Sequence, residues 1–261
     1  MNDSLKCPGL ERALSVFPEM FHCPGCGAEV EIWSDEKKGK CTVCGSYFIK
    51  GRHDKGLVDG RNFQFKVGIL EYADETGIRL YYERYEAELP PSVFEHDRKY
   101  KIACEACKRY GTNLACPPFS PVFHDYIGEF HAAKTICIRI PQEYFSHLAP
   151  EDRYIACFRT GKKLLEEELR QFRKQGFKIA GAGPCLACEE CRTEGTESKC
   201  HKPAKLIYSL ESLGVNLISL AQKGFNINLE WSSNNHLADF VCVIGAVFLN
   251  KKSSRRLQPA P

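Results

Sequence analysis

The sequence predicts a mixed α/β (or α+β) fold with a cysteine-rich core, preceded by a small paired-cysteine module and a β-hairpin. One observation is the cysteine content: eleven of the fifteen cysteines fall into three spaced groups. A second is the alternation of strand-like and helix-like periodicity after residue 97. A third is the lack of a basic-then-apolar export signal, which indicates a reducing compartment where thiolates bind metals rather than form disulfides. We therefore expect a cytoplasmic protein.

Composition and charge exclude several classes of protein. With 43% hydrophobic and 26% charged residues, the chain has the make-up of a globular domain. A formal net charge of +3 is slight, which argues against nucleic acid as a partner. The longest apolar run, Phe240–Leu249, has about half the length of a membrane-spanning helix, so we expect no membrane insertion. No oligomeric state follows from the sequence.

Residues 1–50 carry two pairs of cysteines, Cys23 with Cys26 and Cys41 with Cys44, separated by fourteen residues. Four thiolates arriving in two C-x2-C pairs suit a tetrahedral site. The spacing predicts a zinc ribbon with structural zinc, and a single iron is the alternative occupant. A closed site of four cysteines has no open coordination position, so the ribbon either folds itself or serves as a binding module.

Residues 51–96 are predicted to form a linker and a β-hairpin. Gly51–Gly60 is charged and contains glycine, as linkers do. Apolar and aromatic residues alternate or cluster in Phe63–Tyr72 and Ile78–Tyr85, and turn-forming residues lie between these segments at Asp74–Gly77.

Residues 97–250 are predicted to form the core domain, and residues 251–261 a disordered tail. The longest helix should bury Ile155, Phe158, Leu165, Leu169 and Phe172. The predicted order is a short helix in Pro121–Ala133, a strand at Thr135–Ile140, the long helix Pro150–Gln175, a strand at Phe177–Ala180, a helix led by Pro203 and ended by Gly214, a helix at Val215–Lys223 and a closing strand at Phe240–Leu249.

The most informative stretch holds Cys185, Cys188 and Cys191, followed by Cys200. A C-x2-C-x2-C triplet confines three thiolates to seven residues, a spacing that is typical of iron–sulfur ligation. The predicted helix that begins at Pro203 would place the positive end of its dipole beside an anionic cluster.

A second core group consists of Cys104, Cys107 and Cys116, the last followed by two prolines. Proline after a cysteine fixes the chain there, as in ferredoxin loops. Zinc completed by a histidine is the alternative for this group.

Both core groups together resemble a family of uncharacterised, predicted metal-binding proteins, a domain of unknown function. The resemblance rests on C-x2-C-x2-Y-G-x4-C-P-P, present as Cys104 to Pro118, on A-G-x-C-x2-C-x2-C, present as Ala182 to Cys191, and on S-x-E-x2-G, present as Ser209 to Gly214. It covers about residues 97–249. The chain departs from the pattern at His201-Lys202, before Pro203, and at Leu210. The resemblance implies metal binding and indicates no reaction.

The seven core cysteines suggest one or two [4Fe-4S] clusters. In the simplest allocation the group from Cys185 to Cys200 binds one cluster, and Cys104, Cys107 and Cys116 bind a second cluster by three irons. In a swapped allocation Cys116 joins the loop after Cys185, and Cys200 joins the first pair. In either allocation of two clusters, one iron lacks a thiolate unless His201 or an isolated cysteine such as Cys137 binds it.

Three functions are compatible with these ligands. The first is a redox accessory factor that passes electrons to a partner protein, for instance in low-potential anaerobic metabolism. The second is an enzyme whose open iron acts as a Lewis acid or holds sulfide, with Arg109, Tyr110 or His201 orienting a substrate. The third is a zinc-ribbon module that binds nucleic acid or protein, in which all the metals are structural. The sequence carries no Ser/His/Asp order, phosphate loop or dinucleotide fingerprint.

Overall fold

The chain forms two compact units, seen in a computed structural model. One unit comprises Met1–His53 and Lys66–Glu83, and the other Asp54–Phe65 and Arg84–Pro261. The structure describes residues 18–22, 28–33, 36, 38–45, 47–49, 55–58, 61–73, 79–102, 104–189, 191, 199–229 and 238–250. Within these residues no helix is long and apolar enough to cross a membrane.

The first unit contains short antiparallel strands. Strand β1 (Pro18–His22) pairs with β2 (Glu29–Trp33), and β3 (Lys38–Lys40) pairs with β4 (Tyr47–Ile49). Burial alternates along β2, as its sequence predicts, so that Val30 and Ile32 point inward. These two side chains pack with buried Cys41 in a small core of their own.

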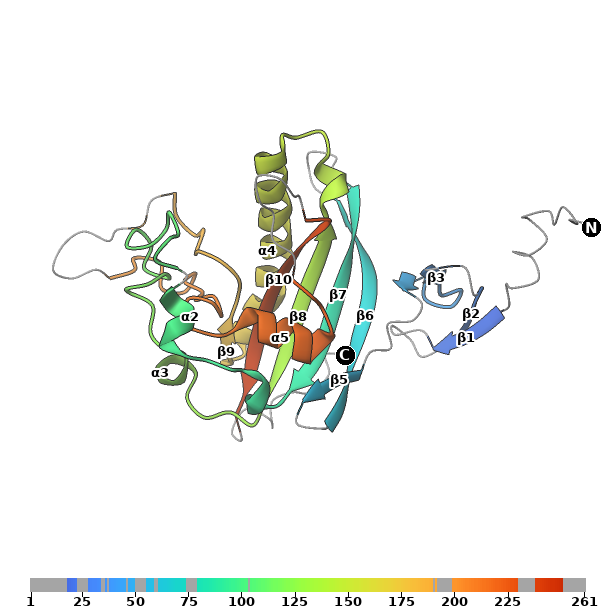
Figure 1. Cartoon of the computed structure of the whole chain (residues 1–261), viewed down its shortest axis with the longest axis horizontal. Helices are drawn as coiled ribbons and strands as arrows, with labels where there is room; N and C mark the ends of the chain where they lie inside the picture. Colours follow the sequence, from blue (N-terminus) through green and yellow to red (C-terminus); the bar gives the residue numbers. More distant parts are fainter. Residues whose placement is uncertain are drawn as a thin grey trace, which may run out of the picture. The chain divides into compact units, whose positions relative to one another are not determined.

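The second unit is built on an antiparallel sheet whose strands β8 (Ala132–Pro141), β10 (Phe240–Leu249) and β9 (Lys178–Ala180) lie side by side (Figure 1). The hairpin strands β6 (Arg61–Ala73) and β7 (Arg79–Leu89) are divided between the two units, and their parts Arg61–Phe65 and Arg84–Leu89 belong to the second unit. The strand order is β6-β7-β8-β10-β9, and β5 (Lys55–Val58) pairs with β6. The other elements are helices α2 (Arg98–Ile102), α3 (Phe123–Ile127), α4 (Pro150–Lys174) and α5 (Leu217–Phe225), with 3-10 turns η1 (Pro91–Val93) and η2 (Gln142–Phe145).

Both faces of strand β10 are covered, which explains why it is apolar throughout. Successive side chains of a strand point to opposite faces. On one face, Val243 lies against Gly161 of α4. On the other face, Phe248 contacts the rings of Phe94, Phe123 and Phe130 at centroid distances of 5.0 to 5.5 Å. A strand that is buried on both faces has a continuous run of apolar residues in its sequence.

Several predicted elements are confirmed. The hairpin, the long helix, the strand before the cysteine loop and the closing strand all form, with bounds within a few residues of those expected. Leu165 and Leu169 are fully buried in α4, whereas Ile155 is 45% exposed, so its assignment to the apolar face was wrong. The segment predicted as a linker includes strand β5. The turn Asp74–Gly77 and residues 251–261 lie outside the described residues.

The α+β form of the predicted fold is the correct one, because β8, β10 and β9 pair antiparallel. Alternating strands and helices had suggested an α/β arrangement as the other possibility. Strands β8 and β9 run in the same direction, because each pairs antiparallel with β10. The elements β8, α4 and β9 therefore form a crossover connection whose two strands are separated by β10.

The predicted helix from Pro203 to Gly214 is wrong, because this segment forms turns. Its carbonyl groups accept hydrogen bonds from outside the segment: Arg173 of α4 donates to the carbonyls of Pro203 and Leu206. The apolar spacing had a different cause, since Ile207, Leu210 and Leu213 are buried without helical backbone. No helix N-terminus is therefore available at Pro203 to favour a cluster.

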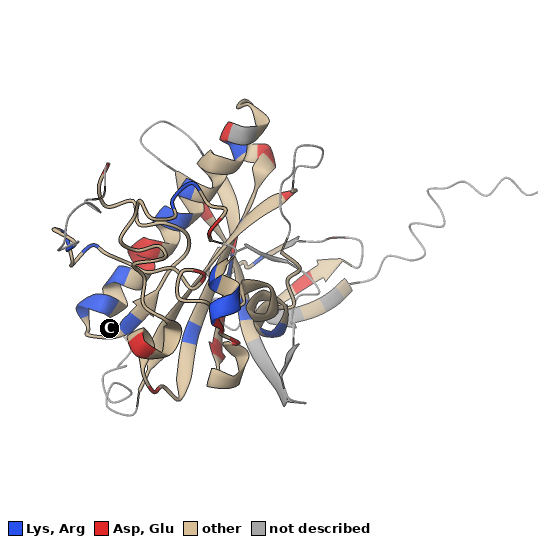
Figure 2. Ribbon diagram, turned by 60° about the vertical axis from the view of Figure 1, so that its left-hand side comes forward, with Lys and Arg blue, Asp and Glu red and all other residues tan. Residues whose placement is uncertain are grey.

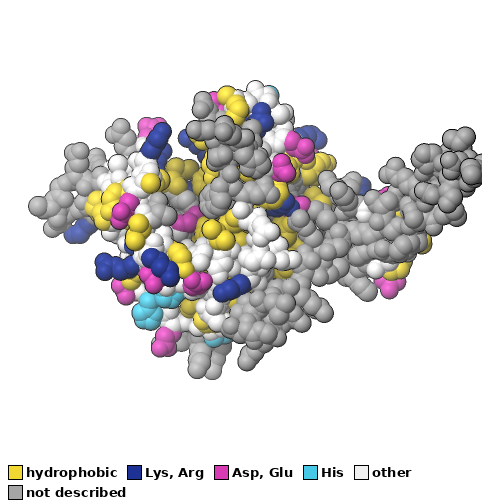
Figure 3. Space-filling view, viewed as in Figure 1, with side chains coloured by type: hydrophobic (Ala, Val, Ile, Leu, Met, Phe, Trp, Pro, Cys, Tyr) yellow, Lys and Arg dark blue, Asp and Glu magenta, His cyan; other side chains and the backbone are white. Residues whose placement is uncertain are grey.

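Basic and acidic residue positions are both scattered along the described ribbon (Figure 2). Apolar side chains are exposed among them, as the space-filling view shows (Figure 3). The large apolar residues that are exposed and lie close in sequence to the core cysteines are Ile102, Tyr110, Phe119 and Leu186.

Candidate metal centre

The second cysteine loop starts from a fixed point at Gly181, directly after strand β9. The Gly181 amide donates to the Tyr208 carbonyl at 2.9 Å, and the Leu210 amide donates to the Gly181 carbonyl at 3.0 Å. One residue further on, buried Lys162 of α4 donates from Nζ to the Ala182 carbonyl at 2.6 Å. The loop is therefore attached to α4 and to the 208–210 segment before its first cysteine.

Gly183 explains the glycine of the A-G-x-C motif. Its φ of +58° is disfavoured for residues with a side chain. A Cβ atom at this position would lie 2.5 Å from Cζ of Phe158. The loop thus turns against the face of α4 at a point where only glycine fits.

The S-x-E-x2-G motif forms a junction rather than a helix. The Ser209 hydroxyl accepts from the Ser212 amide at 3.1 Å, and the Gly214 carbonyl accepts from the Asp97 amide at 2.9 Å. A Cβ on Gly214 would lie 2.8 Å from the Asp97 carbonyl oxygen. The motif therefore connects the start of the second loop to the segment that leads into the first cysteine group.

Glu211, the acidic residue of that motif, lies beneath the cysteine loops. Burial raises the pKa of Glu211, against the opposing effects of nearby amides, the Ser209 hydroxyl and Lys162. Its Oε2 atom is buried and has no hydrogen-bond partner among the residues that the structure describes. Its charge also acts to raise the pKa of the thiols of Cys104 and Cys116, which places it close to the first cysteine group.

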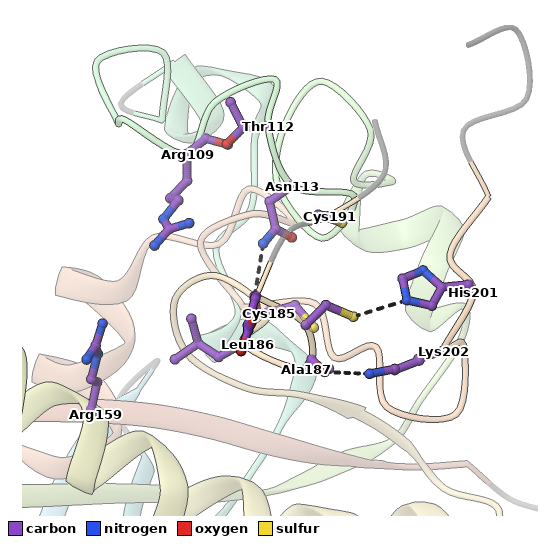
Figure 4. Close-up of a pocket in the computed structure, with 12 residues that line it drawn as sticks. Arg109, Thr112, Asn113, Arg159, Cys185, Leu186, Ala187, Cys191, His201 and Lys202 are labelled. Atoms are coloured by element: carbon purple, nitrogen blue, oxygen red, sulfur yellow. Dashed lines mark hydrogen bonds between the residues drawn. The ribbon is translucent and has the colours of Figure 1, made fainter. Parts of the chain in front are cut away.

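The two core cysteine groups meet directly. Asn113, in the turn before Cys116, donates from Nδ2 to the Cys185 carbonyl at 2.9 Å (Figure 4). The neighbouring Leu114 amide points to Cys191 Sγ at 3.4 Å. Cysteines separated by about 70 residues of chain therefore lie around a shared region, as a jointly ligated cofactor requires.

The thiols of the first group lie close to one another and to the second group. Burial raises the pKa of Cys116 to about 11, and the nearby Cys107, Cys104 and Cys185 add to the rise. Burial likewise raises the pKa of Cys104, with contributions from Glu211 and Cys107. Thiols that resist ionisation when crowded become good ligands once a metal cation compensates their charge.

The structure favours one of the expected additional ligands. His201 lies with its Nε2 atom 3.7 Å from Cys188 Sγ. Cys137 and Cys157 are instead fully buried, Cys137 within strand β8 and Cys157 in helix α4, as expected for core cysteines. Cys242 is partly buried, and Cys7 lies outside the described residues.

The donor set fits a thiolate-ligated metal, although its coordination shell is not closed. In the described part of the chain, no three Cys, His, Asp or Glu side chains are already arranged to hold a metal ion. All seven predicted core ligands are nevertheless free thiols, and each is at least partly exposed: Cys104, Cys107, Cys116, Cys185, Cys188, Cys191 and Cys200. Metal binding would have to bring these sulfur atoms together, and the hydrogen bond between Asn113 and the Cys185 carbonyl already joins the two loops that carry them.

Half of the predicted ribbon site can be described. Cys41 is buried and Cys44 is exposed, and the Gly45 amide donates to the Cys41 carbonyl at 2.9 Å in a tight turn. Cys23 and Cys26 lie outside the described residues.

A pocket of about 990 Å³ opens beside the second cysteine group (Figure 4). His201 lies on one side with its Nε2 atom near Cys188 Sγ, and Arg109 and Arg159 lie on the other side. Sequence reasoning had considered Arg109 and His201 but missed Arg159, which is an exposed residue in the middle of α4. Its only signal was its position next to Phe158, the residue that contacts the glycine of the loop.

Comparison with protein families matches residues 88–249 to the family described as predicted metal-binding protein (DUF2284). The chain belongs to this family. The match covers more than half of the sequence and includes all seven core cysteines and the Ser209 to Gly214 junction. No match was found among curated proteins or among solved structures.

Proposed function

We propose that this DUF2284 protein is an iron–sulfur protein that binds one or two [4Fe-4S] clusters between its core cysteine groups and acts in electron transfer. The observation that carries this proposal is the junction of the two groups through Asn113 and the Cys185 carbonyl, together with the Leu114 amide that points to Cys191 Sγ. Amide groups directed at ligand sulfur tune the potential of such clusters.

The ligand set favours iron–sulfur chemistry over an isolated zinc ion. Seven thiols exceed the four that a tetrahedral zinc site uses, and the C-x2-C-x2-C triplet suits a compact inorganic cluster. The partly exposed thiols of Cys185, Cys188 and Cys191 leave a path for electrons to a partner protein at the surface.

A redox titration of the anaerobically prepared full chain tests this proposal. We expect reversible one-electron reduction, seen as bleaching of broad absorption near about 400 nm and as a paramagnetic signal of the reduced protein. Absence of any reversible redox change between the oxidised and dithionite-treated protein would reject an electron-transfer role.

The pocket supports a second candidate, an enzyme that uses a cluster with one open iron. Its volume of about 990 Å³ lies at the upper end of small-molecule sites, and it borders Cys185, Cys188 and Cys191. An iron without a thiolate would act as a Lewis acid towards an oxygen atom of a substrate. Adding cyanide to the reduced protein distinguishes the candidates, because it should alter the paramagnetic spectrum only if an iron is open.

We also propose that residues 1–50 bind one zinc ion through Cys23, Cys26, Cys41 and Cys44 as a separate module. Support comes from the tight turn between Cys41 and Gly45 and from the small core that contains Cys41. Replacing Cys41 and Cys44 by serine should remove zinc and leave the iron content unchanged. Loss of iron as well would show that the ribbon is part of the cluster domain.

A further inference from the structure

The wall of the pocket opposite the cysteines carries two arginines from different elements. Arg109 follows the first cysteine pair, and Arg159 belongs to helix α4. Their guanidinium groups point towards one another across the mouth of the pocket (Figure 4). Neither guanidinium has a hydrogen bond or an ion pair with any residue in the described ranges. Two like charges that converge in a hollow repel one another unless an anion lies between them.

The remaining polar groups of the pocket are largely engaged elsewhere. Asn113 donates to the Cys185 carbonyl and accepts from the Ala115 amide at 2.9 Å. The Thr112 hydroxyl donates to the Arg109 carbonyl at 3.2 Å. Lys202 reaches the Ala187 carbonyl at 3.4 Å on the side of the cysteines. The two arginines are thus the strongest donors still directed into the cavity.

The charge of the lining agrees with this assignment. Arg109, Arg159 and Lys202 contribute three positive charges and Glu189 one negative charge, so the lining other than the cysteines and His201 has a formal charge of 3 − 1 = +2. Guanidinium groups bind carboxylate and phosphate through paired, charge-assisted hydrogen bonds.

We propose that this pocket binds a small molecule bearing a carboxylate or phosphate group, with Arg109 and Arg159 holding the oxyanion. The positive charges lie in a hollow of ligand size, whereas both signs are mixed over the described ribbon, which favours a small ligand over an acidic protein. The proposal rests on the proposed function in one respect only: the remainder of the ligand would lie beside the cluster-binding cysteines.

Calorimetric titration of the anaerobically prepared full chain tests the site, with inorganic phosphate and citrate as separate probes. We expect saturable binding of at least one probe, and its affinity should fall by about tenfold or more in each of Arg109→Gln and Arg159→Gln. Arg98→Gln is the matched control, because Arg98 is an exposed arginine that does not line this pocket. The affinity of Arg98→Gln for the probe should stay within about twofold of that of the parent protein. A preference for phosphate or for citrate identifies the anionic group.

Two results would overturn the proposal. The first is that neither phosphate nor citrate binds to the folded parent protein. The proposal fails in the same way if only poly-glutamate binds, because the arginines would then form a docking surface for an acidic protein. The other is that Arg98→Gln weakens binding as much as the pocket variants do, which would indicate general surface attraction. Circular dichroism of every variant verifies folding.

Iron and sulfide analysis of the same samples separates this proposal from the proposed function. Anion binding without iron would support the arginine site and reject the cluster. Iron and sulfide without anion binding would support the cluster and reject the arginine site.

Discussion

The Nδ2 atom of Asn113 donates a 2.9 Å hydrogen bond to the carbonyl of Cys185, and this bond joins the two cysteine groups of the core. The same side chain accepts from the Ala115 amide, so it also shapes the turn that leads to Cys116. One residue thus fixes the first group and attaches it to the second.

Asn113→Ala should loosen this junction. Because Asn113 is 5% exposed and both of its hydrogen bonds would be lost, we expect the free energy of unfolding to fall by about 1–3 kcal/mol and the retained iron to decrease. Thr112→Ala is the control, since the Thr112 hydroxyl reaches only the Arg109 carbonyl of its own loop. Denaturant unfolding and iron analysis measure the two effects, and equal losses in both variants would refute a special role for Asn113.

Gly183→Ala should displace the start of the second loop. The new methyl group would clash with Phe158 in addition to the backbone cost of a positive φ. Gly111→Ala is the matched control, because Gly111 has a φ of +71° but nothing within 4 Å of a Cβ. We expect Gly111→Ala to lower the free energy of unfolding by about 1 kcal/mol and Gly183→Ala to lower it clearly more, as measured by denaturant unfolding. Similar costs would show that the contact with Phe158 relaxes freely.

Lys162→Met should weaken the support beneath the loop. Lys162 is 3% exposed, donates to the Ala182 carbonyl and pairs with Glu166 at 2.5 Å. Glu166 keeps Arg170 as a partner, but the Ala182 carbonyl loses its charged donor. We therefore expect the free energy of unfolding to fall by about 3 kcal/mol. Lys174→Met, at an exposed position in the last turn of α4, should lower the free energy of unfolding by about 0.5 kcal/mol in the same measurement. A cost for Lys162→Met no larger than for this control would contradict the account.

Stability should fall in acid through the charge network on β7. Although burial acts to raise it, hydrogen bonds and attraction from Arg84 and Lys134 hold the pKa of Glu86 below its ordinary value. A carboxyl group with a lower pKa in the folded state contributes stability above its unfolded pKa, and this contribution disappears as the pH falls through the folded value. Glu86→Gln should therefore lower the melting temperature at pH 7 and differ less from the parent in acid. An equal difference at both pH values would contradict this assignment.

The sequence predicted the parts of the fold that depend on local periodicity. The alternating or clustered apolar residues of β6 and β7, the strand predicted at Thr135–Ile140 in β8, the long amphipathic pattern of α4 and the apolar run of β10 all correspond to real elements. Strand order could not be predicted, because antiparallel pairing of β10 between β8 and β9 depends on contacts distant in sequence.

The Pro203–Gly214 segment shows where periodicity misleads. Ile207, Leu210 and Leu213 have helical spacing, but long-range hydrogen bonds to Arg173, Gly181 and Phe123 take the place of helical ones. The cysteine motifs identified the candidate ligands. The groups that position them, Asn113 and Lys162, belong to no motif, and neither does the pocket residue Arg159. Their roles emerged only when distant segments came together.

The most direct measurement of the central claim is the iron, acid-labile sulfide and zinc content of the anaerobically prepared full chain. The account predicts about seven to eight irons with matching sulfide if two clusters form, or about four with one cluster, in addition to one zinc. Replacing Cys188 and Cys191 by serine should remove iron and sulfide in equal proportion and leave zinc in place. The loss should be complete if one cluster forms, and about half if Cys104, Cys107 and Cys116 hold a second cluster. A parent protein that holds zinc alone, without sulfide, would contradict the account.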